Sequence, residues 1–193
     1  MRLLFETSRK RWDASTTYEA FTSQFRELLC GDGNSKRVTK IVCFGLGDVN
    51  FKPPDWWRIE NQCKPAHEQE PETSVVEGAL VHHAIALTIA DIARSCAKTG
   101  DTGVRLLTQD PGYSDKTKDL LQEIGFEVIG EYGAAGFAEL DNESIVFSAF
   151  ASVPVKQIVA DLARPVAIIC AGSTSAGVFN HLKYVVPLLS LKL

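Results

Sequence analysis

The residues best suited to chemistry lie in GLGD, residues 45–48, where an apolar run ends in two glycines and an aspartate. The run itself, residues 41–44, is typical of a strand buried on both faces of a parallel sheet. Gly45 and Gly47 allow the backbone to turn sharply and a ligand to approach closely. Open α/β sheets bind ligands outside the carboxyl ends of their strands, so we expect Gly45, Gly47 and Asp48 to contact a substrate.

Other polar residues follow the next predicted strands and are expected at the same edge. Asp110 lies in QDPGY, directly after an apolar run. An acidic residue there commonly accepts hydrogen bonds from a ribose or another polyol, although Asp-Pro-Gly is also ordinary turn chemistry. Glu131 follows the third predicted strand, and Ser148 and Ser152 follow the fourth. The cleft is therefore expected to be lined by residues 45–50, 110–113 and 148–154.

Two histidines lie near this expected cleft. His82 and His83 flank the apolar side of a helix predicted at residues 75–97. A histidine on such a face is more often a hydrogen-bonded core residue than a catalyst. Because two histidines lie near the start of this helix, it is more probable that one of them faces the cleft.

The elements that position these residues alternate between helix and strand. Capping boxes at residues 16–19 and 74–77 predict the starts of two helices, the first beginning at Ser15 or Thr16. Strands are predicted at residues 40–44, 104–108, 126–129, 145–147 and 166–170, with shorter helices at 114–124 and 155–163. This alternation predicts a Rossmann-like three-layer α/β sandwich. Its mostly parallel five-stranded sheet would have the order 3-2-1-4-5, with helices on both faces.

The remaining segments are predicted as an extension and connecting loops. Residues 1–39 form an expected N-terminal helical extension, in which residues 1–14 show no clear period, and residues 40–193 form the α/β domain. Residues 48–73 are predicted as a long loop whose Trp56 and Trp57 pack on the protein or on a ligand. Residues 131–142 are predicted as a loop, and residues 178–189 as a helix interrupted at Pro187.

Composition and charge exclude several classes of protein. Across 193 residues the net charge is −4 and the pI is near 5.6, which argues against a broad nucleic-acid surface. A local basic patch at residues 9–11 stays possible, but three such charges are more typical of a solvated end of the chain. The apolar start is too short for a signal peptide. The stretch 80–93 contains His82, His83 and Asp91, so no membrane span is expected.

The cysteines and glycines argue against bound metals and nucleotides. Five cysteines without CxxC spacing predict reduced thiols, a cytoplasmic location and no metal site. GLGDVN lacks the third glycine of the dinucleotide fingerprint, and Pro53 with Pro54 prevents an immediate helix. We therefore expect no cofactor.

Four segments carry a family resemblance. IVCFGLG, HHAIALTIADIA, TQDPGYSDKTKDLLQEIGFEVI and PVKQIVADLARPVAIIC resemble the fungal branch of the SRR-like (sensitivity to red light reduced) domain family, over about residues 40–170. The resemblance implies a Rossmann-like fold. Plant and animal members are linked to light signalling, circadian timing and haem metabolism. A fungal set associated with the domain consists of arginine-containing cyclodipeptide synthases of secondary metabolism, which join aminoacyl groups from charged tRNAs into a diketopiperazine.

On this resemblance the expected function is that of an aminoacyl transferase of the cyclodipeptide synthase type. Its partner would be a charged tRNA, and the amino-acid group would occupy the cleft at the sheet edge. The implied roles are as follows: Asp48, Asp110 and Glu131 hold a guanidinium, Ser148 or Ser152 accepts the acyl group, and His83 or Tyr113 moves protons.

Two alternatives stay open. A non-catalytic regulatory or adaptor domain explains the missing cofactor fingerprint with fewer assumptions. An S-adenosylmethionine-dependent methyltransferase would use GLGD and Asp110, but the long loop broken by prolines argues against it. The sequence makes no prediction of the oligomeric state.

Overall fold

The computed structural model describes the chain except for residues 32–35, 51–52, 54, 98–102, 172–181 and 187–193. The helices are α1 (Arg2–Asp13), α2 (Thr16–Cys30), α3 (Asp55–Cys63), α4 (Thr73–Cys96), α5 (Asp115–Glu123), α6 (Ala135–Ala138) and α7 (Val155–Leu162). The strands are β1 (Lys40–Phe44), β2 (Arg105–Gln109), β3 (Glu127–Val128), β4 (Ser144–Ser148), β5 (Ala167–Ala171) and β6 (Leu182–Val186).

The strand order confirms the predicted topology. The sheet runs β3-β2-β1-β4-β5-β6, and its first five strands are parallel in the order 3-2-1-4-5. β6 is a sixth strand, antiparallel to β5. The helix predicted at residues 178–189 is therefore wrong over Leu182–Val186, and the rest of that prediction lies outside the described residues. The short link from β5 to β6 favours an antiparallel neighbour, because a parallel one needs a crossover of about a dozen residues or more.

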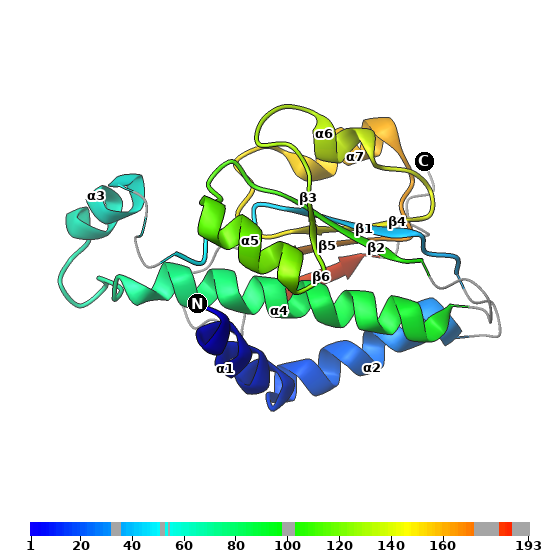
Figure 1. Cartoon of the computed structure of the whole chain (residues 1–193), viewed down its shortest axis with the longest axis horizontal. Helices are drawn as coiled ribbons and strands as arrows, with labels where there is room; N and C mark the ends of the chain where they lie inside the picture. Colours follow the sequence, from blue (N-terminus) through cyan, green and yellow to red (C-terminus); the bar gives the residue numbers. More distant parts are fainter. Residues whose placement is uncertain (32–35, 51–52, 54, 98–102, 172–181, 187–193) are drawn as a thin grey trace.

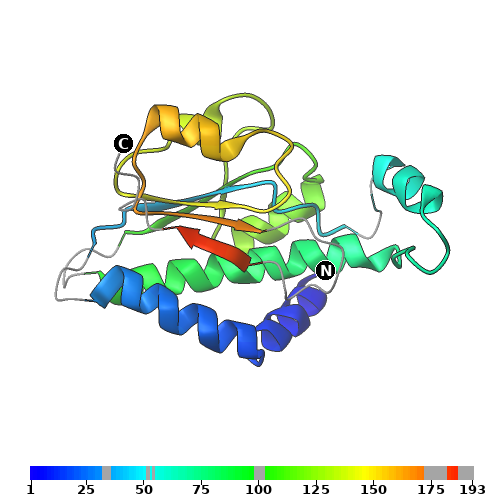
Figure 2. The same cartoon turned by 180° about the vertical axis from the view of Figure 1, so that it is seen from behind.

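Alternate residues of each central strand pack on opposite faces of the sheet. Ile41 and Cys43 of β1 belong to the core cluster with α2 and α4, while Val42 and Phe44 pack with Val159 of α7. This period of two is what buries a strand on both faces. Figures 1 and 2 show the resulting layers, with α1, α2 and α4 on one side of the sheet and α6 and α7 on the other.

The long helix α4 lies in the centre of the helical layer and is buried nearly all round from Val76 to Ala93. By length and mean hydropathy α4 could cross a membrane, but 78% of its most apolar window is buried inside the protein, as in a core helix. The predicted capping box at Ser74 is wrong. Glu72 is the N-cap residue, and the buried Ser74 hydroxyl makes no hydrogen bond to the described residues.

The N-terminal helices pack onto α4. Residues 1–14, which show no clear period in the sequence, contain α1, and this helix buries Phe5 and Trp12 on one face. The Trp12 indole Nε1 donates a hydrogen bond to the Thr88 hydroxyl of α4 at 3.0 Å. α2 starts where expected, and its cap is Ser15, whose hydroxyl accepts from the Tyr18 N–H.

Two predicted loops contain helices, and one pair of cysteines is bonded. α3 lies within residues 48–73 and α6 within residues 131–142, so the prediction of loop throughout is wrong for both segments.

A disulfide joins Cys30, at the end of α2, to Cys96, at the end of α4. The expectation of reduced thiols is wrong for this pair, whereas Cys43, Cys63 and Cys170 are free.

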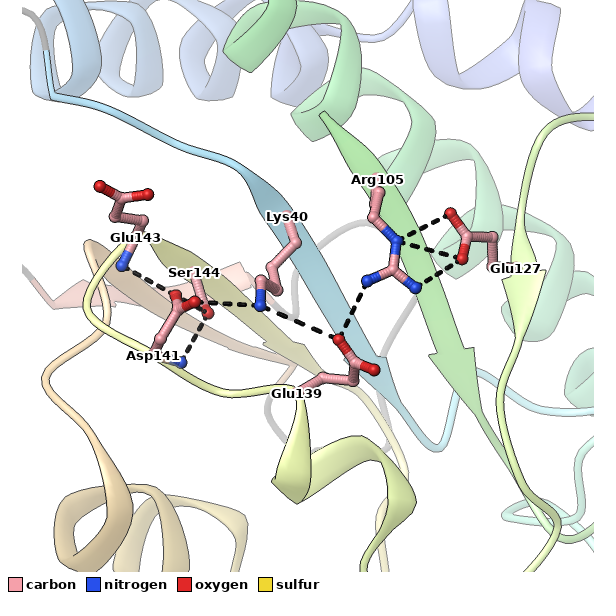
Figure 3. Close-up of polar contacts among 7 residues, drawn as sticks. All are labelled: Lys40, Arg105, Glu127, Glu139, Asp141, Glu143 and Ser144. Carbon is pink, nitrogen blue, oxygen red and sulfur yellow. Dashed lines mark hydrogen bonds and ion pairs between the residues drawn. The ribbon is translucent and has the colours of Figure 1, made fainter. Parts of the chain in front are cut away.

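Ion pairs cross the amino edge of the sheet, opposite the expected site (Figure 3). Lys40 and Arg105 are register partners on β1 and β2, so two cations stand side by side. Glu139 lies between them, 3.1 Å from Arg105 and 3.8 Å from Lys40. Asp141 and Glu127 pair with the outer sides of Lys40 and Arg105, respectively. The connection from α6 to β4 is thereby attached across two strands.

Candidate functional site

The turn after β1 is held against the protein on both sides of its glycines. Gly45 and Gly47 have φ values of 65° and 90°, a conformation that favours glycine. A Cβ at Gly45 would lie 2.5 Å from the Ala151 nitrogen, and a Cβ at Gly47 would lie 3.0 Å from the Ala79 Cβ. The Phe150 N–H also donates to the Gly45 carbonyl at 2.8 Å. The space beside both glycines is thus filled by the chain itself.

Asp48 fastens this turn to the start of α5. One carboxylate oxygen accepts hydrogen bonds from the Ser114 N–H at 3.1 Å, the Ser114 hydroxyl at 3.0 Å and the Thr117 hydroxyl. A carboxylate at a helix N-terminus satisfies free N–H groups and interacts favourably with the helix dipole. The other oxygen, Oδ2, makes no hydrogen bond to the described residues.

Asp110 lies beside Asp48 and joins the two turns. Its Oδ2 accepts from the Gly47 N–H and its Oδ1 from the Gly112 N–H, both at 2.8 Å. The turn that Asp-Pro-Gly predicts is therefore present, and the carboxylate also reaches the turn after β1. Burial raises the pKa of Asp110, the two backbone N–H groups oppose this, and the charge of Asp48 adds to it. Within the described residues, neither carboxylate has an ion-pair partner.

His83 and Tyr113 form a buried hydrogen-bonded chain beneath these turns. His83 Nδ1 lies 2.7 Å from the Ala79 carbonyl, and Nε2 lies 3.0 Å from the Tyr113 hydroxyl, which is 2.7 Å from the Thr108 hydroxyl. Burial lowers the pKa of His83 to about 4, although the hydrogen bond to the Ala79 carbonyl acts in the opposite direction and raises it. Burial also raises the pKa of Tyr113 well above its usual value. Both side chains are therefore neutral near pH 7, and their hydrogen bond joins α4 to the turn after β2.

The remaining predicted site residues are spread along the same edge. Ser148 ends β4 and is 8% exposed, and Ser152 lies exposed in the following loop. Glu131 is exposed and pairs with Lys118 of α5, and among the described residues it shares no hydrogen-bond partner with the two aspartates. His82 is buried and packs edge-on against the rings of Phe147 and Phe150. The two aspartates and Tyr113 thus lie in the turns after β1 and β2, close to His83 of α4, whereas the serines belong to the β4 side.

Gln109 is a residue of this edge that the sequence did not single out. It ends β2 and is 6% exposed. Its Oε1 accepts from the Gly136 N–H at 2.9 Å, and its Nε2 donates to the Gly133 carbonyl at 3.3 Å. These bonds hold the segment with α6 over the ends of β1 and β2, where Phe137 stacks on Phe44. The sequence feature that could have identified Gln109 is its position, because it is a polar residue directly after the apolar run of β2.

Large apolar side chains remain exposed in segments that follow the strands. Trp56, Tyr132 and Phe150 come after β1, β3 and β4 and are 64%, 76% and 58% exposed. Trp57 is half-buried, so the adjacent tryptophans have different environments. A cleft of about 110 Å³ lies elsewhere, between α1 and α4, and is lined by residues that include Arg11 and Glu77.

The fold and this edge define an α/β protein of the open, doubly wound class, whose polar residues gather where ligands of that class bind. Residues 18–183 match the SRR1 domain, and the chain belongs to the SRR1 domain family. No curated protein and no solved structure matches it significantly.

Proposed function

We propose that the chain is an aminoacyl transferase that joins an arginyl group from charged tRNA into a cyclic dipeptide. The observation that supports this most directly is the pair of carboxylates, Asp48 and Asp110, at the carboxyl edge of the sheet. They repel each other, and no cationic side chain among the described residues neutralises them. A positively charged ligand would relieve this repulsion.

A guanidinium suits such a pair better than most cations. It stays charged at any working pH and presents parallel N–H groups that match carboxylate oxygens. Asp48 Oδ2 is the acceptor left over after Oδ1 has bonded Ser114 and Thr117. Arginine is therefore the amino acid that we assign to this position.

The chemistry then requires the attack of an amine on an ester. The α-amine of one aminoacyl group attacks the ester carbonyl of the other, an amide bond forms, and the ribose oxygen leaves with the proton that the amine loses. A second attack of the same kind closes the ring and releases the other tRNA. The burial of Ser148 disfavours an acyl intermediate on that residue, and we propose direct attack. His83 and Tyr113 would act as positioning residues for the Asp110 turn.

The test is incubation with a panel of charged tRNAs that includes arginyl-tRNA, followed by mass spectrometry for cyclic dipeptides. We expect an arginine-containing product, reduced about tenfold or more in Asp48→Asn and Asp110→Asn. Asp115→Asn, which changes an exposed carboxylate on α5, is the matched control and should retain activity. Absence of product across the whole panel contradicts the proposal.

A second candidate is a regulatory or adaptor domain without catalysis, as in the circadian and haem-related members. Two observations favour it: the burial of His83, Tyr113 and Ser148, and the exposed aromatic residues. Isothermal titration with nucleotides and haem precursors addresses it, because an absence of binding would favour protein contacts alone. The methyltransferase alternative gains no support, since the protein fills the space beside Gly45 and Gly47. A thermal shift with S-adenosylmethionine tests that alternative.

A further inference from the structure

The helix α3 is clamped to the segment that follows it. The Asn61 side chain is 8% exposed and bonds the Glu70 main chain twice, with Nδ2 donating to the carbonyl at 2.8 Å and Oδ1 accepting from the N–H at 2.9 Å. Lys64 pairs with the Glu70 carboxylate at 3.3 Å, and its carbonyl accepts a hydrogen bond from Gln69. These bonds fix which side of α3 faces inward.

The opposite side of α3 carries an apolar stripe that faces solvent. Trp56 and Ile59 are each 64% exposed, and Cys63 is exposed one turn further along. Their spacing of three and four residues places them on one side of the helix, and we refer to this stripe as the α3 face. Figures 1 and 2 show α3 standing apart from the sheet and from the other helices. Tryptophan is among the residues most enriched at the energetic centres of interfaces.

The segment that carries the α3 face is acidic, and two of its carboxylates, Asp55 and Glu60, lie on α3 itself. Residues 55–72 contain five carboxylates (Asp55, Glu60, Glu68, Glu70 and Glu72) and two cations (Arg58 and Lys64), so their net charge is −3 with His67 neutral. Arg58 pairs with Asp55 and Lys64 with Glu70, which leaves the surplus negative. An occupant of the α3 face therefore needs apolar groups at its centre and positive charge around them.

We propose that the α3 face docks a basic amphipathic helix of a partner protein, a role beyond the transfer reaction. A second copy of the chain would bring the same acidic residues against each other. An anionic lipid surface or a nucleic acid would meet this negative charge with its own. A helix with leucine-like residues on one side and lysine or arginine beside them satisfies both requirements.

The test uses two synthetic 18-residue peptides with the same leucine positions, one carrying lysine and the other glutamate at the polar positions. Isothermal titration to the full chain should detect binding of the lysine peptide and none of the glutamate peptide. Trp56→Ala and Ile59→Ala should each weaken binding about tenfold or more. The matched control is Leu162→Ala, which changes an apolar residue on α7 that is 56% exposed, and it should leave the affinity unchanged.

Several results would overturn the proposal. The first is equal affinity of Trp56→Ala and wild type for the lysine peptide. The second is equal binding of the lysine and glutamate peptides, and the third is no binding of the lysine peptide. Self-association in sedimentation equilibrium that Trp56→Ala abolishes would assign the face to a second copy instead. Flotation with phosphatidylserine vesicles that the same variant abolishes would assign it to a membrane. Since Trp56 and Ile59 are exposed, both alanine variants should keep the wild-type melting temperature. If either variant melts at a lower temperature, the binding measurement is repeated with Ile59→Ser.

Discussion

His83 Nε2 and the Tyr113 hydroxyl lie 3.0 Å apart, and this contact ties α4 to the turn after β2. The Ala79 carbonyl can only accept, so His83 Nδ1 carries the proton and donates to it. Nε2 of the neutral ring is then an acceptor, the Tyr113 hydroxyl donates to it, and the Thr108 hydroxyl donates to Tyr113. Every buried donor in this chain has an acceptor only while His83 is uncharged.

The first prediction is a loss of stability in acid caused by His83. Its pKa is about 4 in the folded protein against an ordinary 6.5, so its contribution is complete above pH 6.5. As the pH falls towards 4 the unfolded chain takes up the proton first, and the free energy of unfolding should fall by about 3 kcal/mol. Urea unfolding between pH 7.5 and 4 measures this. His83→Phe should have a shallower pH dependence than wild type.

The control for this prediction is His67→Gln, because the His67 side chain is 81% exposed and lies beside the carboxylate of Glu68. It should reproduce the wild-type pH dependence. Subtracting the free energy of unfolding of His83→Phe from that of wild type at each pH cancels the contributions of the carboxylates, which both proteins share. An identical slope in these two proteins would mean that His83 does not titrate as we infer.

The second prediction separates two costs of replacing a glycine. Gly125 has a φ of 96° and a Cβ there would meet no described atom within 4 Å, so Gly125→Ala should cost only the conformational strain, about 1–2 kcal/mol. Gly45→Ala adds a clash with the Ala151 backbone and should destabilise by about 2 kcal/mol more. Denaturant unfolding of both variants measures the difference. Equal effects would show that the close approach at Gly45 is unimportant.

The five parallel strands and their order could be predicted because each of these strands carries its own local signal. The run at residues 41–44 ends in glycine and that at 104–108 ends in Asp-Pro-Gly, and alternation with helices restricts the order. α1 has no such signal, since Phe5 and Trp12 are separated by mostly charged residues and are buried because they pack onto α4 and its neighbours. β6 likewise forms because the open edge of β5 accepts it.

The candidate site was predictable in position but not in its bonds. Asp48 and Asp110 follow neighbouring parallel strands, so their proximity follows from the strand order. The partners of Asp48 on α5 are 66 and 69 residues away, and the Ala151 backbone fills the space beside Gly45. Such contacts depend on how α5 and the β4 loop pack, which no local pattern contains.

The third prediction concerns Glu139, which lies between Lys40 and Arg105 (Figure 3). Glu139→Gln leaves two neighbouring cations with less neutralisation, so the free energy of unfolding should fall by up to about 1 kcal/mol. The effect should shrink in 1 M salt because the groups are partly exposed. Glu123→Gln, which removes an exposed pairing with Arg2, should have almost no effect. A salt-independent loss would point to packing rather than charge.

The fourth prediction concerns the disulfide between Cys30 and Cys96. It closes a loop with a sequence separation of 66 residues, for which the chain-entropy estimate is about 4 kcal/mol as an upper value. Reductant, or the double variant Cys30→Ser with Cys96→Ser, should therefore lower the midpoint of denaturant unfolding. Cys63→Ser, which changes an exposed free thiol, should leave it unchanged. Thiol titration of the unfolded, unreduced chain should detect only Cys43, Cys63 and Cys170, and reactive Cys30 and Cys96 would contradict the bond.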